Sequence, residues 1–257
     1  MKSVEIIDPF ATSQWDNHVA SFSTAAFYHS SAWLKVLCET YKYRPACFVV
    51  RESAHISCML PCLEIDTWLT GRRGVALPFT DECELLHAEG TGIQDLESHL
   101  LRHGFDRKWR SLALHGTARV FNEERPSLSF YRHYLALSPG PDKLFCALKG
   151  TTRNQVRQAQ EQGVSVQIGS SPQLLDGYYK LHCRTRRKHG LPPQPVAFFR
   201  NIQRHCLKSG KGILTLAYHD GSPIAGALFL HFQKRAHYKY SASVEAKLQL
   251  RRNNLVM

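Results

Sequence analysis

The sequence predicts an α+β protein, and two observations support this fold class. Residues 212–243 contain three apolar or alternating runs, at 213–218, 223–232 and 237–241, separated by short polar turns. Such a pattern is typical of consecutive antiparallel strands. Elsewhere, apolar residues recur at helical spacing, as Trp33, Leu37 and Tyr41 do. Sheet and helices therefore share one chain without strict alternation.

The first half is expected to mix short strands with three helices. The helix from Ser31 to Lys42 is capped by Ser30 and Ser31, and Pro45 prevents its continuation. A third helix, at 91–104, opens with a capping box of Thr91 and Gln94. The other expected elements are strands at 4–7, 74–79, 111–115 and 130–137, a helix at 15–22, and a hairpin of 47–51 and 55–65.

A domain boundary is expected at Ser138-Pro139-Gly140-Pro141, because two prolines and a glycine interrupt regular structure there. This gives domains at 1–138 and 139–257. The second domain is expected to hold helices at 142–148, 152–163, 172–189 and 196–208 before its strands. Thr152 opens a capping box, and Ser171-Pro172 combines a cap with a first-turn proline. Both halves run helix, strand, turn, apolar strand, so a duplicated domain is one interpretation.

Composition and termini favour a soluble, cytoplasmic protein. The 257 residues are 43% hydrophobic, the first residues lack the features of a signal peptide, and no apolar run is long enough for a transmembrane segment. The eight cysteines include no Cys-x-x-Cys pair and are expected to be reduced and mostly buried. His55, Cys58 and Cys62 are spaced along a strand, which would divide them between two faces, so no metal site is expected.

The excess of positive charge lies in the second half. Residues 1–138 carry 14 Lys and Arg against 16 Asp and Glu, a net charge of −2, whereas residues 139–257 carry 19 against 5, a net of +14. A phosphate-bearing or polyanionic partner would explain this asymmetry. The alternative is a generally soluble basic surface.

Gly226 interrupts the apolar run 224–230, which is too continuous for a strand with one solvated face. A glycine in such a strand indicates a bulge or a place where another group approaches the backbone. One interpretation is packing in a central sheet. The other is a catalytic role, in which backbone N–H groups of a bulged strand polarise an acyl carbonyl.

Two groups of cations are candidate anion-binding residues. Arg184, Arg187 and Lys188 share one face of the predicted helix 172–189, and Arg153 and Arg157 lie one turn apart on the preceding helix. Guanidinium groups bind phosphate or carboxylate in bidentate fashion. A solvated helix surface is the alternative for both groups.

Asp81, Tyr238, Lys239 and Tyr240 are candidates for contact with substrate. Asp81 follows a predicted strand and could bind or deprotonate an amine, or simply cap a turn. Tyr238 and Tyr240 share one strand face and Lys239 lies on the other. The sequence has no Gly-x-x-x-x-Gly-Lys, Gly-x-Gly-x-x-Gly or Gly-x-Ser-x-Gly motif, which disfavours nucleotide hydrolysis, dinucleotide redox chemistry and serine hydrolysis.

Several segments together resemble the Fem-type (FemAB-like) acyltransferases, specifically the Fem-related proteins linked to exosortase and PEP-CTERM exopolysaccharide systems. The resemblance covers most of the chain, and its most specific part is residues 186–195. The segments are Ser31-Ala32-Trp33-Leu34, Thr40-Tyr41-Lys42-Tyr43-Arg44-Pro45, Leu77-Pro78-Phe79-Thr80-Asp81, Tyr179-Lys180-Leu181-His182, Arg186-Arg187-Lys188-His189-Gly190-Leu191-Pro192-Pro193-Gln194-Pro195, Phe198-Phe199, Ala225-Gly226-Ala227, residues 238–243 and Asn253-Asn254-Leu255.

This resemblance implies tandem GNAT-like (acyl-CoA N-acyltransferase) domains and transfer of an acyl or aminoacyl group to an amine. The implied donor is aminoacyl-tRNA or acyl-CoA, with no bound cofactor. Residues 250–255 differ from the usual coenzyme A motif, which counts against acyl-CoA. Glu82-Cys83-Glu84 departs from the family's glycine-rich continuation, and the second domain looks truncated beside the family.

The expected function is therefore acyl or aminoacyl transfer to an amine of an envelope or polysaccharide precursor, in cell-envelope (peptidoglycan) or exopolysaccharide assembly, by an enzyme that could be inactive if truncated. The alternative is a non-catalytic anion- or nucleic-acid-binding module on the same fold. Donor, acceptor and oligomeric state do not follow from the sequence.

Overall fold

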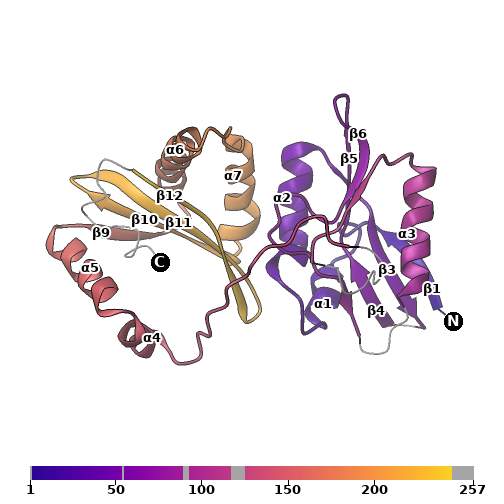
Figure 1. The fold of residues 1–257 in the computed structure, drawn as a ribbon, viewed down its shortest axis with the longest axis horizontal. Helices are drawn as coiled ribbons and strands as arrows, with labels where there is room; N and C mark the ends of the chain where they lie inside the picture. The colour runs from indigo at the N-terminus through magenta and orange to yellow at the C-terminus, as the bar shows by residue number, and fades with distance from the viewer. Residues whose placement is uncertain (1, 54, 89–92, 117–124, 245–257) are drawn as a thin grey trace. The chain divides into compact units, whose positions relative to one another are not determined.

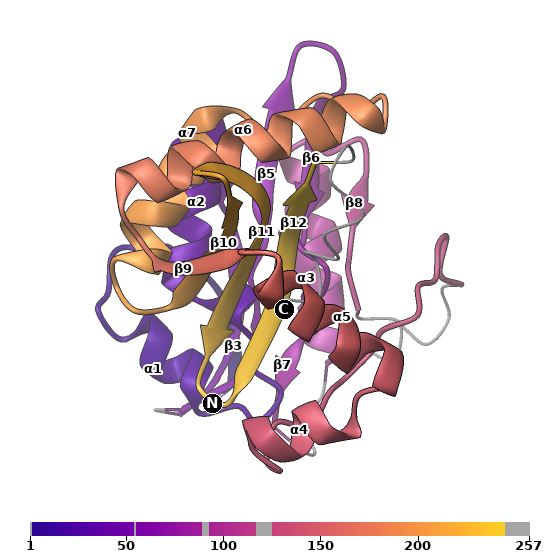
Figure 2. The same ribbon diagram turned by 90° about the vertical axis from the view of Figure 1, so that its left-hand side faces the viewer.

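The structure is a computed structural model that describes residues 2–53, 55–88, 93–116 and 125–244 (Figures 1 and 2). These residues form two compact units. Unit 1 holds the described residues up to Ser127 together with His231–Ala236, and unit 2 holds Leu128–Leu230 and the described residues from His237 onward. The boundary expected after Ser138 lies at the end of an exposed segment, 125–138, that has neither helix nor strand.

Unit 1 is built on two four-stranded sheets, ordered β1-β3-β4-β7 and β2-β5-β6-β8. Its pairs are antiparallel except for the parallel β6–β8 pair. The strands are β1 Lys2–Ile7, β2 Arg44–Pro45, β3 Cys47–Glu52, β4 His55–Leu60, β5 Leu63–Thr67, β6 Gly71–Val75, β7 Leu86–His87 and β8 Leu112–Ala113. The helices are α1 Trp15–Ala20, the 3₁₀ turn η1 Phe27–His29, α2 Ser31–Tyr41 and α3 Gln94–Asp106.

Helix α2 begins and ends where the sequence predicts. Ser30 is its N-cap, and the Ser30 side chain accepts a hydrogen bond from the Trp33 backbone N–H. Lys42, with a φ of 60°, closes the helix in the left-handed conformation. The helix buries Trp33 and Leu37 completely, so its apolar face forms part of the core of unit 1.

Unit 2 has one four-stranded sheet, ordered β12-β11-β10-β9, with helices on both of its sides (Figures 1 and 2). Its strands are β9 Ser165–Gly169, β10 Gly212–His219, β11 Ser222–Phe232 and β12 Arg235–Ser243. Its helices are α4 Pro141–Ala147, α5 Gly150–Glu161, α6 Pro172–Lys188 and α7 Val196–Ile202, which continues into the π-helical turn η2 Gln203–Leu207.

The two sides of this sheet pack against different helices. Ala159 of α5 packs in one cluster with Ala225 and Ala227 of β11. The side chain of Tyr178, from α6, approaches Gly226 from the opposite face. Alternate residues of β11 thus serve opposite faces of the sheet, and this strand is buried on both, as the run 224–230 predicts.

Several sequence predictions in these units are wrong. The strand expected at 55–65 is two strands, β4 and β5, which belong to different sheets. Residues 130–137 form no strand and are exposed, because an alternating pattern without a strand to pair with gains no ladder of hydrogen bonds. Thr152 does not cap α5, which begins at Gly150 after Lys149. Gly104 does not end α3, which continues to Asp106. The cap assigned to Thr91 lies outside the described residues.

Strand β9 was not expected from the sequence, although residues 164–168 alternate apolar and polar side chains. It pairs antiparallel with β10, with Thr215 opposite Ile168, and extends the predicted three-stranded sheet to four strands.

The α6 cap is as predicted, since the Ser171 side chain accepts a hydrogen bond from the Leu174 N–H at 3.2 Å. In the described part of the chain, no helix combines the length and apolarity needed to cross a bilayer.

Candidate functional site

Gly226 lies opposite Leu216 in the pairing of β10 with β11. A Cβ at this position would lie 2.7 Å from Leu216 Cδ1, 2.9 Å from Tyr178 Cδ2 and 3.0 Å from the Thr215 carbonyl oxygen. The side chains that approach the backbone here are therefore those of Leu216 and Tyr178. The strand is also bulged, but at Ile224, because Ala217 pairs with Ala225 and the next residue of β10 pairs with Pro223.

A cluster of aromatic rings and one histidine covers the α6 side of the sheet. His182 of α6 lies at its centre, with ring centroids 4.7 Å from Phe199 and 5.8 Å from Tyr240. Phe198 and Tyr178 complete it, at 6.1 Å from Tyr240 and from His182 respectively. We call these five residues the α6 ring cluster. It joins α6, α7 and β12 and places the predicted site residue Tyr240 against both helices.

Two buried polar atoms of the α6 ring cluster have no hydrogen-bond partner among the described residues. They are the Tyr178 hydroxyl and Nδ1 of His182. The other ring nitrogen of His182, Nε2, lies 2.8 Å from the side-chain oxygen of Gln194. Because an amide oxygen only accepts, Nε2 carries the proton and Nδ1 presents a lone pair. Buried polar atoms without a hydrogen-bond partner are uncommon in proteins, and a ligand or a water molecule can supply the missing hydrogen bond.

Burial controls the ionisation of both groups. It lowers the pKa of His182, against the effect of the hydrogen bond that His182 donates to Gln194, and the nearby charge of Arg186 lowers it further. Burial also raises the pKa of Tyr178 well above its usual value, and the neighbouring phenols of Tyr240 and Tyr238 add to the shift. The cluster thus holds a neutral imidazole beside a protonated phenol.

The segment 186–195 is attached to α6 through Gln194. Its side chain holds His182, and its backbone oxygen accepts a hydrogen bond from the Tyr179 hydroxyl at 3.1 Å. The loop is folded back on α6, since the Leu191 N–H donates to the Arg186 carbonyl. His182, Tyr178 and Gln194 were not chosen as site residues from the sequence. The spacing of Tyr178 and His182, four apart on one helix, was the available signal.

The remaining β12 candidates lie at the edge of this cluster. Tyr238 is 46% exposed and its ring lies 5.2 Å from that of Phe229. The Lys239 ammonium lies 5.2 Å from the Tyr240 ring centroid, within the range of a cation–π contact. Tyr240 is half-buried, so part of its surface is open to a ligand.

The two groups of predicted cations belong to opposite sides of the sheet. Arg184, Arg187 and Lys188 are exposed on the C-terminal half of α6. Arg153 and Arg157 are on α5, the helix whose Ala159 packs on the other face; Arg153 donates to the Cys146 carbonyl at 3.1 Å and so joins α5 to α4. The five side chains therefore do not form one binding surface.

Asp81 lies in unit 1, in the loop that follows β6. Its carboxylate accepts a hydrogen bond from the buried Tyr28 hydroxyl at 2.6 Å, and the neighbouring Thr80 side chain accepts from Trp33 Nε1 at 2.9 Å. Leu77 and Phe79 both have a φ of 57°, a conformation that bulky side chains rarely adopt. Strain of this kind persists where surrounding contacts enforce it and is common at binding sites.

Within the described residues, no group of three or more His, Cys, Asp or Glu side chains is placed to hold a metal ion. His55 and Cys58 both lie on β4, and Cys62 follows that strand.

Comparison with known proteins identifies the class of fold. Residues 147–257 match the family model described as an acetyltransferase (GNAT) domain. This region contains β9, α6, α7 and β10–β12, and so the whole α6 ring cluster. The chain has an α+β, GNAT-like fold, as the sequence predicts.

Two solved structures resemble the chain in fold. The chain is similar to the crystal structure of FemX, with 14% sequence identity and a TM-score of 0.69 over 98% of this chain and 83% of that one. It is also similar to a tandem GNAT protein from the clavulanic acid biosynthesis pathway, with 13% identity and a TM-score of 0.49 over 100% and 83% of the two chains. No curated protein matches the sequence.

Proposed function

We propose that the protein is a Fem-type acyltransferase that moves an acyl or aminoacyl group to an amine in cell-envelope or exopolysaccharide assembly. The donor is an aminoacyl-tRNA or acyl-CoA, and the setting is the cytoplasm. The link to exosortase and PEP-CTERM systems belongs to the same proposal and rests on the sequence resemblance.

The observation that supports acyl transfer most is the match of residues 147–257 to the acetyltransferase domain. In unit 2 this region carries the half-buried Tyr240 and the two unpartnered polar atoms of Tyr178 and His182. These features supply polar groups beside the sheet, where a substrate could complete their bonding.

The reaction is attack by a neutral amine on the carbonyl of an ester or thioester. A C–N bond forms, the C–O or C–S bond breaks, and the amine proton passes to the leaving oxygen or sulfur. Backbone N–H groups that polarise the carbonyl lower the barrier. From the residues alone this role is expected at Gly226, but β11 lies between β10 and β12. We therefore place it on β12, which is the edge strand of the sheet within the described residues.

Binding and positioning supply the rest of the rate enhancement. Tyr240 helps to place the amine in unit 2. Asp81, in unit 1, remains the other residue proposed from the sequence to bind or deprotonate an amine. Tyr238 and Lys239 flank Tyr240 on β12. Arg184, Arg187 and Lys188 bind phosphates of the donor, which accords with the net charge of +14 on residues 139–257.

The experiment is a transfer assay with the purified full chain. Charged tRNA and acyl-coenzyme A, each with a labelled acyl group, are incubated with amine-bearing peptidoglycan and exopolysaccharide precursors. We expect label to move to an amine from one of these donors, and the Tyr240→Phe variant to lower kcat at least several-fold. Absence of transfer from every donor to every acceptor overturns the enzymatic proposal.

Matched variants test which cations contact the donor. The double variant Arg187→Gln/Lys188→Gln should raise the KM for a tRNA donor and reduce its salt dependence, since each phosphate contact adds about one unit to the slope of log K against log salt. Arg157→Gln, on the other side of the sheet, is the control and should leave both unchanged. Equal effects of the two variants would show that general charge is responsible.

The second candidate is a non-catalytic nucleic-acid-binding module, favoured by the same basic half. It predicts salt-dependent binding of tRNA that is the same for charged and uncharged molecules. Measuring both affinities at two salt concentrations distinguishes it from the enzyme, which should prefer its acylated donor.

A further inference from the structure

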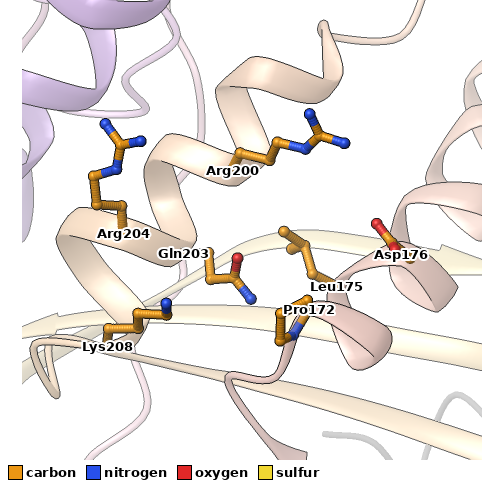
Figure 3. Close-up of a pocket in the computed structure, with 7 residues that line it drawn as sticks. All are labelled: Pro172, Leu175, Asp176, Arg200, Gln203, Arg204 and Lys208. Carbon is orange, nitrogen blue, oxygen red and sulfur yellow. The ribbon is translucent and has the colours of Figure 1, made fainter.

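A hollow of about 290 Å³ lies in unit 2, between the first turns of α6 and the end of α7 with η2 (Figure 3). Its volume is close to that of small-molecule sites. It shares no residue with the α6 ring cluster. Its lining residues are Pro172, Leu175, Asp176, Arg200, Gln203, Arg204 and Lys208.

Two cations face this hollow without a charge partner. Figure 3 shows the side chains of Arg200 and Lys208 extending toward the space between α7 and α6. Neither makes a hydrogen bond or ion pair with any described residue, and both are exposed. Like charges held at one site repel each other, and a bound anion would remove that repulsion.

The backbone conformation between these cations is unusual. In η2 the Lys208 N–H donates to the Gln203 carbonyl at 3.0 Å, five residues back rather than four. A π-helical turn of this kind is rare and is frequent at functional sites. It changes the direction of the side chains after Gln203, so that Lys208 faces the same hollow as Arg200, eight residues earlier.

The first turn of α6 forms the other wall of the hollow, and its end of the helix favours negative charge. The first turn of α6 contributes the positive end of a 17-residue helix. Gln203, which is 8% exposed, donates from its side-chain amide to the Ser170 carbonyl at 2.8 Å and so fixes α7 to the start of α6. Leu175 provides a buried apolar floor. The backbone elements on both sides of the hollow are thus joined by a direct hydrogen bond.

Asp176 gives the hollow a second chemical preference. Its carboxylate faces the Arg200 side of the hollow in Figure 3, yet no ion pair within the described residues joins the two. A carboxylate would repel a bare anion but would accept hydrogen bonds from hydroxyl groups. A ligand that carries both a phosphate and neighbouring hydroxyls satisfies Arg200, Lys208 and Asp176 together.

We propose that this hollow binds a small phosphate ester of a sugar or other polyol. Lys208 and Arg200 bind the phosphate, near the N-terminus of α6, and Asp176 accepts hydrogen bonds from the hydroxyls. The site is separate from the acyl-transfer chemistry proposed above, so it can exist whether or not the protein is an acyltransferase.

The test is calorimetric titration of the full chain with inorganic phosphate, ribose 5-phosphate and ribose. We expect ribose 5-phosphate to bind most tightly and ribose not to bind. Lys208→Gln and Arg200→Gln should each weaken ribose 5-phosphate about tenfold, the effect of losing one charge-assisted hydrogen bond. Asp176→Asn should weaken ribose 5-phosphate but not inorganic phosphate.

Arg157→Gln is the matched control, since it removes one exposed cation of unit 2 that lies on α5, outside the hollow, and it should leave all affinities unchanged. These residues are on the surface, and circular dichroism of each variant verifies its fold. No binding of either phosphate at millimolar concentration, or binding that is indifferent to Lys208 and Arg200, overturns the site. Equal affinity for phosphate and ribose 5-phosphate overturns the assignment of the ligand as a polyol ester.

Discussion

At the scale of single residues, the most informative observation is that the buried Tyr178 hydroxyl lacks a hydrogen-bond partner among the described residues. The Tyr178 side chain is fully buried, and its oxygen has no partner among the described residues. Burying an unpaired hydroxyl costs roughly 1–3 kcal/mol. A protein that keeps such a group either tolerates the cost or uses the hydroxyl with a ligand.

The variant Tyr178→Phe distinguishes these possibilities. We expect the free energy of unfolding, measured with urea, to rise by about 1 kcal/mol, because the unpaired hydroxyl is removed without loss of ring packing. If the hydroxyl contacts substrate, activity falls in the same variant. The control is Tyr28→Phe, which should lose about 1 kcal/mol, since that hydroxyl donates to Asp81. A large loss in Tyr178→Phe would contradict the unpaired state.

Gly226 provides a second residue-scale prediction. The Gly226→Ala variant should lose about 1–3 kcal/mol of folding free energy, because the new methyl group meets the Leu216 side chain, the Tyr178 ring and a backbone oxygen. Thermal unfolding measures the loss. Gly150→Ala is the control: it lies at the start of α5, where a Cβ has ordinary contacts, and should be neutral or stabilising. Equal stability of Gly226→Ala and the parent protein would show that β11 adjusts freely.

At the scale of elements, the buried carboxylate of Glu64 joins the sheet β2-β5-β6-β8 of unit 1 to the segment that follows α3. Glu64 of β5 accepts hydrogen bonds from Arg107 at 2.6 and 2.9 Å and from Trp109 Nε1 at 2.8 Å. The Trp109 ring also packs over Gly74 of β6. These contacts fix the end of α3 against the sheet.

These hydrogen bonds to Glu64 make the free energy of unfolding depend on pH. The hydrogen bonds from Arg107, assisted by Trp109, lower the pKa of Glu64 to about 2. A carboxylate with a lowered folded-state pKa contributes stability that is fully present above its unfolded pKa, about 4.3, and is lost as the pH falls toward 2.

Unfolding measurements from pH 7 to pH 2 test this contribution. Glu64→Gln should be less stable than the parent protein by about 2 kcal/mol at pH 7, because a charge-assisted pair is lost. The difference should shrink below about pH 4, where Glu64 in the unfolded chain is already protonated. A difference that stays constant down to pH 2 would contradict the lowered pKa.

At the scale of the whole molecule, the thiols report on the core. All eight cysteines are free, and five of them are buried: Cys47, Cys58, Cys62, Cys83 and Cys206. Only the deprotonated thiolate reacts, and burial raises the pKa of Cys58, Cys62 and Cys206 to about 12. The buried thiols of both units should therefore be inert in the folded protein.

Titration with a chromogenic thiol reagent tests this expectation. We expect the exposed Cys146 to react first and at most three thiols to react before unfolding. The remaining five should react only when denaturant unfolds the chain. Cys146→Ser is the control and should remove the fast phase alone. Reaction of all eight thiols under native conditions would contradict the buried assignment.

Local sequence patterns were sufficient to predict the elements whose formation depends on residues close together in the chain. Ser30 and Ser171 cap their helices as expected, because a cap depends on the side chain and the next three residues. The strands of residues 212–243 were predicted because turn residues and apolar runs set them. Residues 130–137 were mispredicted for the complementary reason, since a strand exists only where another strand pairs with it.

The chain by itself thus determined the α+β class, the main helices, the central strands and the concentration of positive charge in its second half. Only the tertiary structure decided which side chains meet. It separated Arg153 and Arg157 from the α6 cations, brought Tyr178, His182 and Tyr240 together, and turned Arg200 and Lys208 toward one hollow. The physical reason is that capping and periodicity act over a few residues, whereas a site depends on which faces of distant elements pack against each other.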